Sequence, residues 1–319
     1  MTTDKTNWHF LVNPAARRGK AIERWREILP KLLVALPKMT VAESTSDLGM
    51  ANLAEAAVRS GHVRLVGVGG DGTHHDILNG IVAADGLDKV VYAPLPLGTG
   101  NDWVRSVQVP RDIDKWLAIL KYEDTISHSV GQLRYTSRND GTPFNKIAYF
   151  LNVAGMAYDS VVVRYSEKAP YKHRLIYPLL TLLYLRKFTP PTVRIEYDGQ
   201  VFTGSVHTIN FGIGRYSGGG MRLVPHADPE GDSLALTFAR ELPTWKIIKE
   251  SWRFYAGSIG RLNEVTTTHT KKIVVTPVTG IAELEADGEW LGLAPVEVSL
   301  LKGRLKVITD GYRVGSAFT

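Results

Sequence analysis

A glycine-rich turn at residues 66–73 carries the strongest chemical signal in the sequence. It reads Val-Gly-Val-Gly-Gly-Asp-Gly-Thr and links an apolar segment, predicted as a buried strand, to a predicted helix. Glycines let a backbone approach a phosphate closely and turn its N–H groups toward it, and the start of a helix adds a favourable dipole. Because four glycines around one aspartate are costly in a turn that binds nothing, we predict a phosphate-binding loop here.

A second glycine turn, Leu-Gly-Thr-Gly-Asn-Asp at 97–102, follows the next predicted strand. Two phosphate-type loops on neighbouring strand ends suit a polyphosphate better than a nicotinamide cofactor. The first turn does contain the Gly-x-Gly-x-x-Gly pattern of dinucleotide-binding enzymes, but the acidic residue required about 20 positions later is missing from 90–94. A Walker A loop is excluded because Gly19-Lys20 is followed by Ala21, where a Ser or Thr must bind magnesium.

Four motifs, in the right order along nearly the whole chain, resemble the diacylglycerol and sphingosine lipid kinases, especially the small soluble bacterial lipid kinases. They are Asn13-Pro14 with Gly19, the turns at 69–73 and 97–102, and Asp287-Gly288-Glu289. NAD kinases and phosphofructokinases share the Gly-Gly-Asp-Gly loop, whereas the Gly-Thr-Gly-Asn-Asp loop and the late Asp-Gly-Glu are more specific. The resemblance implies an α/β nucleotide-binding domain with a parallel sheet of NAD-kinase and phosphofructokinase type, followed by a mainly β-sandwich domain, with the active site in the cleft.

The resemblance also implies which residues bind the nucleotide. In such kinases the cofactors are ATP and Mg²⁺, and the first loop, a threonine after the second strand and the two glycine turns hold the nucleotide. The corresponding positions here are Asn13, Pro14, Ala15, Ala16, Arg17, Thr45, Gly69, Gly70, Asp71, Gly72, Thr73, Thr99 and Asn101.

Three carboxylates are implied in catalysis: Asp71, Asp102 and Glu289. Asp102 would hold magnesium or order its water, and Glu289 would take the proton of the lipid hydroxyl. Asp71 would lie close to the γ-phosphate, either as the base or as an organiser of magnesium, and the sequence leaves both roles open. Phosphoryl transfer depends on positioning and charge neutralisation more than on covalent chemistry, which this set of groups can supply.

The sequence departs from the family pattern at two places with chemical consequences. Ser129 stands where the domain junction usually has an aspartate, which removes one expected carboxylate. The usual Asp-Gly of a magnesium-binding loop is inverted to Gly231-Asp232. The resemblance implies a structural Mg²⁺ there, held by Asp232 with Asp228 and Ser233 alongside.

Residues 1–128 are predicted to form one α/β domain. Because parallel strands carry ligands at their carboxyl ends, this domain would place both glycine turns at one edge of its sheet. Predicted strands at 8–12, 39–42, 63–68 and 90–94 alternate with predicted helices at 22–33, 51–60 and 76–84.

Residues 129–302 are predicted to form the mainly β, lipid-substrate domain, and 303–319 to return to the first domain. The strand at 192–197 is a candidate edge for pairing between two chains in a homodimer. Predicted strands lie at 192–197, 201–210, 234–238, 272–276 and 296–300, and predicted helices at 171–187 and 244–255.

Composition excludes several classes of protein. The chain has 319 residues, 44% hydrophobic and 22% charged, as in folded globular proteins. The absence of cysteine excludes disulfides, thiolate zinc sites, iron–sulfur clusters and cysteine nucleophiles. A net charge of +6 favours an anionic partner, but the basic residues are dispersed without interleaved aromatics, so no nucleic-acid partner is expected.

A cytoplasmic location is expected because the densest apolar segment, 175–185, is shorter than the roughly 20 residues that span a bilayer, and no signal peptide precedes it. Basic residues flank this segment. The pattern predicts either transient, peripheral contact with the inner face of the membrane or a core helix with solvated ends. The flanking residues are Lys168, Lys172, His173, Arg174, Arg186 and Lys187.

The predicted function is an ATP- and Mg²⁺-dependent lipid kinase that phosphorylates a hydroxyl of a diacylglycerol-like or sphingoid lipid. Two alternatives remain: a kinase of a soluble acceptor, as in NAD kinases, and a nucleotide-binding regulator without turnover, motivated by Ser129 and Gly231-Asp232. His74 and His75 are expected near solvent in a first helical turn rather than as metal ligands, because adjacent histidines diverge around a helix.

Overall fold

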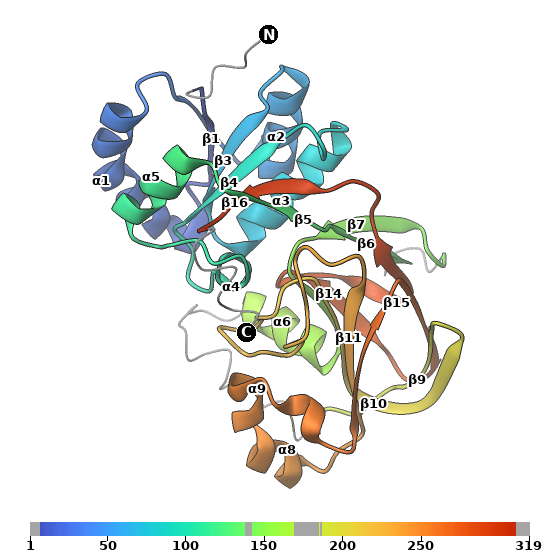
Figure 1. Ribbon diagram of the computed structural model, residues 1–319. Coiled ribbons are helices and arrows are strands. Elements are labelled where there is room, and N and C mark those ends of the chain that lie inside the picture. Colours follow the sequence, from blue (N-terminus) through green and yellow to red (C-terminus); the bar gives the residue numbers. More distant parts are fainter. Residues whose placement is uncertain (1–6, 138–141, 169–184, 186, 311–319) are drawn as a thin grey trace. The chain divides into compact units, whose positions relative to one another are not determined.

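The computed structural model describes residues 7–137, 142–168, 185 and 187–310 (Figure 1). Contacts divide the chain into two compact units, and each has its own sheet: unit 1 is Met1–His128 with Gly303–Thr319, and unit 2 is Ser129–Lys302. Within the described ranges, no helix is both long and apolar enough to cross a bilayer.

Unit 1 contains a six-stranded sheet in the order β2-β1-β3-β4-β16-β5. The strands from β2 to β16 run parallel to their neighbours, and only β5 is antiparallel to β16. The predicted α/β domain with a parallel sheet is therefore confirmed, and the carboxyl ends of β1 to β4 share one edge. The bounds are β1 (His9–Val12), β2 (Thr40–Glu43), β3 (Arg64–Gly69), β4 (Val91–Pro96), β5 (Thr125–His128) and β16 (Leu305–Ile308).

The helices of unit 1 follow the strands in alternation. They are α1 (Lys20–Ala35), α2 (Met50–Arg59), α3 (Asp71–Ala83), α4 (Asp102–Ser106) and α5 (Ile113–Tyr122), with a short 3-10 helix at Ala16–Gly19. Helix α3 begins five residues earlier than predicted, because the glycine turn passes directly into its first turn. Helices α2 and α3 pack closely at Gly80, where a Cβ would lie 2.1 Å from the carbonyl oxygen of Ala51.

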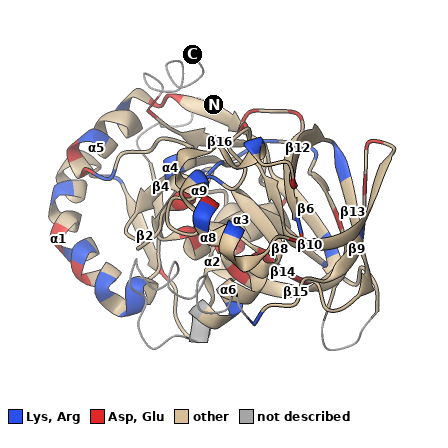
Figure 2. Cartoon of the chain, turned by 90° about the horizontal axis from the view of Figure 1, so that it is seen from below, with Lys and Arg blue, Asp and Glu red and all other residues tan. Residues whose placement is uncertain are grey.

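Helix α1 shows how the hydrophobic pattern selects its buried face. Ala21, Trp25, Ile28 and Leu32 recur at intervals of three and four residues and are buried. The ring of Trp25 packs 5.7 Å from that of Phe10 in β1, measured between centroids. The lysine, arginine and glutamate residues of α1 are exposed, and their positions are the blue and red segments along this helix (Figure 2).

Unit 2 is antiparallel, and the pairings of six of its strands form a closed circuit. From β10 the circuit passes through β8, β14, β15, β13 and β9 and returns to β10. Strands β11 and β12 continue from β10, and β6 and β7 extend from β15. The predicted mainly β domain is confirmed. The bounds are β6 (Gly131–Thr136), β7 (Lys146–Phe150), β8 (Val153–Ala157), β9 (Thr192–Tyr197), β10 (Gln200–Gly212), β11 (Leu234–Arg240), β12 (Val265–Thr270), β13 (Lys272–Thr279), β14 (Glu283–Ala286) and β15 (Glu289–Leu300).

The closed circuit corrects one expectation. Strand β9 pairs with β10 and with β13, so it has no free edge for a second chain, and the homodimer predicted through this strand loses its basis. The predicted helix at 244–255 is two short helices, α8 (Thr244–Glu250) and α9 (Trp252–Ala256), and α6 (Tyr158–Lys168) follows β8. Of the predicted helix at 171–187, all but Leu185 and Lys187 lie outside the described residues.

Candidate active site

The loop after β1 is fastened to the loop after β3 by Asn13. Its backbone N–H donates to the carbonyl of Val68 (3.1 Å), and its side-chain amide donates to the hydroxyl of Thr73 (2.9 Å). Its side-chain carbonyl accepts from the N–H of Ala15 (3.1 Å). One asparagine therefore orders its own loop and positions it against the glycine turn.

The rest of the first loop exposes cations at the same edge of the sheet. Arg17, Arg18 and Gly19 all adopt left-handed backbone conformations, with φ of 53°, 57° and 85°, which turn the chain sharply into α1. The side chains of both arginines are exposed. Arg17 was among the predicted nucleotide-binding residues, whereas Arg18 was not, although the run of two arginines before a glycine was visible in the sequence.

The two glycine turns lie backbone against backbone. The N–H of Leu97 donates to the carbonyl of Gly69 (2.8 Å), and a Cβ on Gly98 would lie 2.3 Å from the Cα of Gly70. Only glycine permits this approach. Asn101, whose φ is 54°, closes the second turn by donating from its side chain to the carbonyl of Gly98 (3.0 Å).

Asp71 and Asp102 converge on one point between these turns. Each begins a helix, and a Cβ on Gly100 would lie 3.0 Å from Oδ2 of Asp71 and 3.9 Å from Oδ2 of Asp102. The N–H of Trp103 donates to Oδ1 of Asp71 (3.1 Å) and fixes its orientation. Mg²⁺ is usually bound by one or two carboxylates together with phosphate oxygens. This donor set fits that cation.

A buried aromatic layer lies beneath the turns and corrects the expectation for the histidines. His74 and His75 are 1% and 7% exposed, not near solvent, because α3 packs this side on the sheet. Nδ1 of His74 lies 2.6 Å from the hydroxyl of Tyr92, and burial lowers the pKa of His74 to about 3. A Cβ on Gly67 would lie 1.9 Å from that hydroxyl, so this glycine makes room for Tyr92.

The remaining predicted nucleotide-binding residues occupy the same edge of unit 1. Thr45 follows β2, and its hydroxyl and N–H hold a turn with Leu48 at 3.0 Å each. Thr99 is exposed on the second glycine turn, and Gly72 lies in the first turn of α3. The structure thus gathers the predicted nucleotide-binding residues in unit 1, whereas Glu289 belongs to unit 2.

The Asp-Gly-Glu motif forms the tight hairpin between β14 and β15. Asp287 and Gly288 have φ of 51° and 87°, as this turn requires. The carboxylate of Asp287 is buried and accepts from the N–H groups of Leu151 (3.0 Å) and Asn152 (2.9 Å). Glu289 is exposed. Of the two carboxylates of this motif, that of Asp287 is therefore held inside the fold, whereas Glu289 lies at the surface.

Sequence reasoning missed a buried carboxyl next to this hairpin. Glu285 is 2% exposed, and its Oε2 accepts from the N–H of Gly288 (3.0 Å). Burial, followed by the charges of Asp159, Asp287 and Glu289, holds the pKa of Glu285 well above its usual value. A Cβ on Gly155 would lie 2.5 Å from Oε1 of Glu285, so the glycine of β8 creates the space.

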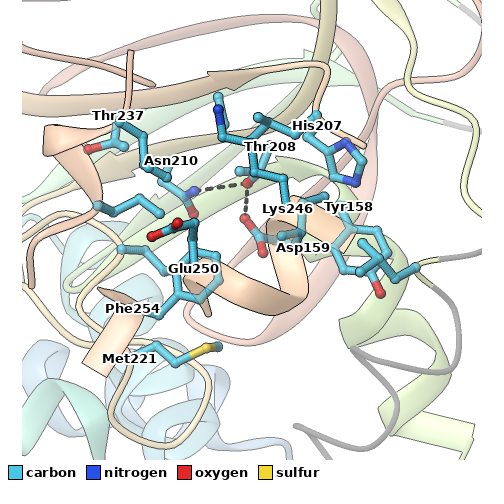
Figure 3. Close-up of a pocket in the computed structure, with 17 residues that line it drawn as sticks. Tyr158, Asp159, His207, Thr208, Asn210, Met221, Thr237, Lys246, Glu250 and Phe254 are labelled. Carbon is cyan, nitrogen blue, oxygen red and sulfur yellow. Dashed lines mark hydrogen bonds between the residues drawn. The ribbon is translucent and has the colours of Figure 1, made fainter. Parts of the chain in front are cut away.

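A mostly apolar pocket within unit 2 contains the second missed carboxylate, Asp159, at the start of α6. The hydroxyl of Thr208 donates to Asp159, and the side chain of Asn210 donates to that hydroxyl (2.9 Å; Figure 3). Burial raises the pKa of Asp159 to about 6, opposed by the hydrogen-bonding side chains of Thr208 and Asn210, which lower it. The pocket is lined by Tyr158, Asp159, Leu185, His207, Thr208, Asn210, Met221, Leu223, Thr237, Ala239, Leu242, Lys246, Ile247, Glu250, Phe254, Ile259 and Leu262.

In the loop predicted to bind a structural Mg²⁺, several of the oxygen atoms that could bind the ion form hydrogen bonds within the protein instead. Asp228 accepts from the N–H of Glu230 (3.1 Å), and the hydroxyl of Ser233 lies 3.3 Å from Nδ1 of His269. Ser129 donates its hydroxyl to the carbonyl of Gly231 (2.6 Å). In the described part of the chain, no three His, Cys, Asp or Glu side chains form a group that could hold a metal. The site at Asp228, Asp232 and Ser233 stays a prediction.

Two family models match this chain, one for each part of the fold. The diacylglycerol kinase catalytic domain matches residues 7–133, and the YegS C-terminal NAD kinase beta sandwich-like domain matches residues 152–309. The chain belongs to the diacylglycerol kinase family of lipid kinases. As a lipid kinase, it is a phosphotransferase that uses an alcohol group as acceptor.

Individual relatives of this lipid kinase agree with the models. A diacylglycerol kinase of Staphylococcus carnosus is 26% identical over 306 residues, 94% of this chain and 94% of that protein. The structure of a diacylglycerol kinase from Bacillus anthracis matches with a TM-score of 0.70 at 21% identity, covering 98% of this chain and 99% of that one. Yeast NADH kinase, solved with NADH, matches with a TM-score of 0.57 at 11% identity, covering 95% and 83%. These structures show the fold alone.

Proposed function

We propose that this lipid kinase uses ATP and Mg²⁺ and transfers the γ-phosphate to the hydroxyl of a diacylglycerol-like or sphingoid lipid. The observation that carries the proposal is the convergence of Asp71 and Asp102 beside two backbone-packed glycine turns. Glycine turns whose N–H groups face a phosphate, together with two carboxylates, provide what a magnesium-bound polyphosphate needs. Mg²⁺, when bound, would neutralise phosphate charge as it develops.

The residues of unit 1 would hold the nucleotide in place. The N–H groups of the turns at 69–73 and 97–102 would donate to phosphate oxygens, and the exposed Arg17 would attract the same charge. Asp71 and Asp102 would bind the cation, with Asp71 oriented by the N–H of Trp103. Thr45 and Asn13, which follow β2 and β1, would complete the proposed nucleotide site.

The residues of unit 2 would hold the acceptor. The pocket beside Asp159 offers apolar walls for an acyl or sphingoid chain, with Asp159, Thr208 and Asn210 as its polar side. Glu289 would take the proton from the acceptor hydroxyl as that oxygen forms a bond to the γ-phosphorus and the bond from phosphorus to the bridging oxygen of ADP breaks. Behind the hairpin, burial raises the pKa of the Glu285 carboxyl, which accepts a hydrogen bond from the N–H of Gly288 (3.0 Å).

Location follows from the substrates. ATP is cytoplasmic and the acceptor resides in a bilayer, so we propose a cytoplasmic enzyme in transient, peripheral contact with the inner face of the membrane. The net charge of +6 favours such an anionic surface.

The test is transfer of labelled γ-phosphate from ATP to a panel of acceptors, with Mg²⁺ or with EDTA. The panel comprises diacylglycerol, monoacylglycerol, phosphatidylglycerol, sphingosine, ceramide and, as a soluble acceptor, NAD. Glu289→Gln is the test variant, and Glu297→Gln is its matched control, because Glu297 lies on the same strand and pairs with Lys272 (2.7 Å).

We expect magnesium-dependent label in one lipid, lost by about 100-fold or more in Glu289→Gln and retained in the control. Label in NAD alone would overturn the lipid acceptor. Binding of ATP without transfer to any acceptor would overturn catalysis and favour a nucleotide-binding regulator.

A further inference from the structure

A stripe of large apolar side chains lies exposed on α8 and α9. Trp245, Ile248, Trp252 and Tyr255 are 65%, 48%, 55% and 50% exposed. Their spacing of three, four and three residues places them on one helical face. In contrast, Trp8, Trp25, Trp103 and Trp116 are fully buried. Large apolar side chains are costly to leave in water, so four exposed ones within eleven residues require an explanation.

The two helices act as one element with two faces. Ser251, which joins them, has the helical dihedral angles φ −58° and ψ −28°, so the face continues across the junction. The opposite face carries Lys246, Ile247, Glu250 and Phe254, which line the apolar pocket of unit 2 (Figure 3). The exposed stripe is therefore the outer side of one wall of that pocket.

The basic residues of this element differ in their partners. Lys246 forms an ion pair with Glu264, and Arg253, whose guanidinium lies 4.7 Å from the centroid of the Trp252 ring, forms one with Glu250 (2.6 Å). Lys249 lies between the exposed Ile248 and Trp252, is itself exposed, and has no acidic partner within the described part of the chain. The outer face thus combines two tryptophans, a tyrosine, an isoleucine and an unneutralised cation.

We propose that this outer face (Trp245, Ile248, Lys249, Trp252 and Tyr255, the α8–α9 face) docks on an anionic phospholipid bilayer. Tryptophan and tyrosine are favoured at the boundary between headgroups and acyl chains, where the ring is buried and its polar atom stays hydrated. Lys249 would meet lipid phosphates at the same depth. An amphipathic helix binds a bilayer with this arrangement of side chains. The choice of a lipid surface rests on the proposed lipid-kinase function.

A second copy of the chain fits the face less well. In a symmetric pair the same patch would face itself, which would bring Lys249 toward its counterpart in the centre of the contact. Uncompensated like charges in an apolar interface are unfavourable. A bilayer containing phosphatidylglycerol instead supplies the opposite charge.

The test measures binding to vesicles of phosphatidylcholine with 30 mol% phosphatidylglycerol, and to vesicles of phosphatidylcholine alone. The variants are Trp245→Ser with Trp252→Ser, and Lys249→Gln. The matched control is Val201→Ser with Ile281→Ser, since these exposed residues of the same unit lie outside the face. Quenching of tryptophan fluorescence by phospholipids brominated on the acyl chain reports insertion directly. Thermal unfolding checks that each variant is folded.

We expect the double tryptophan variant to bind anionic vesicles at least tenfold more weakly and to lose most of the quenching. Lys249→Gln should bind anionic vesicles about fivefold more weakly than the wild type, and neutral vesicles almost equally well. A fivefold change in affinity corresponds to about 1 kcal/mol, the contribution of one cation near an anionic surface. The control should bind as the wild type does.

Three results would overturn the docking face: unchanged vesicle binding in the double variant, a concentration-dependent dimer that this variant abolishes in sedimentation velocity, or short-wavelength emission of the two tryptophans before any vesicle is added. The third would show that the chain itself covers the face.

Kinase assays separate this proposal from the proposed function. With a short-chain, water-soluble diacylglycerol the variants should match the wild type, and with diacylglycerol in vesicles they should be slower. Wild type that binds vesicles but phosphorylates no lipid would overturn only the function.

Discussion

The side-chain amide of Asn13 donates a hydrogen bond to the hydroxyl of Thr73 at 2.9 Å, across 60 positions of sequence. This bond joins the loop after β1 to the glycine turn after β3. The same residue also orders its own loop through the N–H of Ala15. The relative position of the two loops therefore depends on one side chain.

Replacing Asn13 separates its two roles. Asn13→Ala removes both side-chain hydrogen bonds, so we expect about 1–2 kcal/mol less stability and about tenfold weaker ATP binding. Asn13→Asp keeps an acceptor for the N–H of Ala15 and for the Thr73 hydroxyl, but it adds a negative charge beside the proposed phosphate-binding turn. Its stability should stay close to that of the wild type while ATP affinity falls. Titration calorimetry and urea unfolding measure the two quantities, and equal loss of stability in both variants would contradict this division.

The contact between the glycine turns predicts a sharp effect of one methyl group. In Gly98→Ala the new Cβ would lie 2.3 Å from the Cα of Gly70, so one turn must move. We expect a loss of about 1–3 kcal/mol in stability and about 100-fold in kinase activity, since small displacements of phosphate-binding groups are costly. Gly49→Ala is the control, because nothing lies within 4 Å of its Cβ position. Equal activity of the two variants would show that the close approach is not needed.

Asp159 predicts a pH dependence of stability. Its pKa rises from 3.8 to about 6 on folding, so the folded protein binds this proton more tightly than the unfolded chain does. The free energy of unfolding should therefore fall by about 3 kcal/mol as pH rises from about 4 to 6, and this contribution should be level above that range.

Asp159→Asn removes the titrating carboxyl, so comparing this variant with the wild type isolates the contribution of Asp159 to the pH dependence of stability. The difference in unfolding free energy between wild type and variant, measured by urea denaturation at several pH values, should change in favour of the variant between pH 4 and 6. Glu241→Gln, at an exposed carboxylate of the same unit, is measured alongside as the control variant. A flat difference for Asp159→Asn would contradict the raised pKa.

Ser129 offers a test of why an aspartate is absent there. Its hydroxyl donates to the carbonyl of Gly231 (2.6 Å), and its N–H donates to the carbonyl of Pro229 (2.8 Å). Ser129→Ala should cost about 1 kcal/mol through the lost hydrogen bond, and Ser129→Asp about 2–3 kcal/mol because a carboxylate would face a carbonyl oxygen. Thermal unfolding measures both. Full stability together with higher activity in Ser129→Asp would show that the loop accepts the carboxylate.

The two glycine turns, at 69–73 and 97–102, could be predicted from the sequence because the residues that indicate each turn are neighbours along the chain. Glycine is needed at positions 70 and 98 because the backbones of the two turns approach each other closely there. Each turn also directly follows an apolar strand. Parallel strands then bring the turns together without any knowledge of side-chain packing. Gly67 belongs to the same short pattern, but its role is to accommodate Tyr92 from another strand, which the local sequence does not indicate.

The polar groups of unit 2 could not be predicted because they depend on the pairing of distant strands. Asp159 meets Thr208 only because β8 pairs with β10, and Glu285 meets Gly155 only because β14 pairs with β8. The link between Ser129 and Gly231 spans 102 positions. Nothing in the local sequence of these residues distinguishes them from surface carboxylates and hydroxyls. The stripe at Trp245 and Trp252, by contrast, follows helical spacing and was readable.

Strand β16 has a consequence for how the enzyme is made. It lies between β4 and β5, although residues 305–308 are synthesised after all of unit 2. While the ribosome is still translating unit 2, the first sheet lacks its fifth strand, and β4 and β5 have no partner on the sides that face it. Unit 2, from Ser129 to Lys302, has no such gap. Unit 1 is thus the first part of the polypeptide to be made and the last to be completed. A chain that ends before β16 would leave the sheet of unit 1 without the strand between β4 and β5.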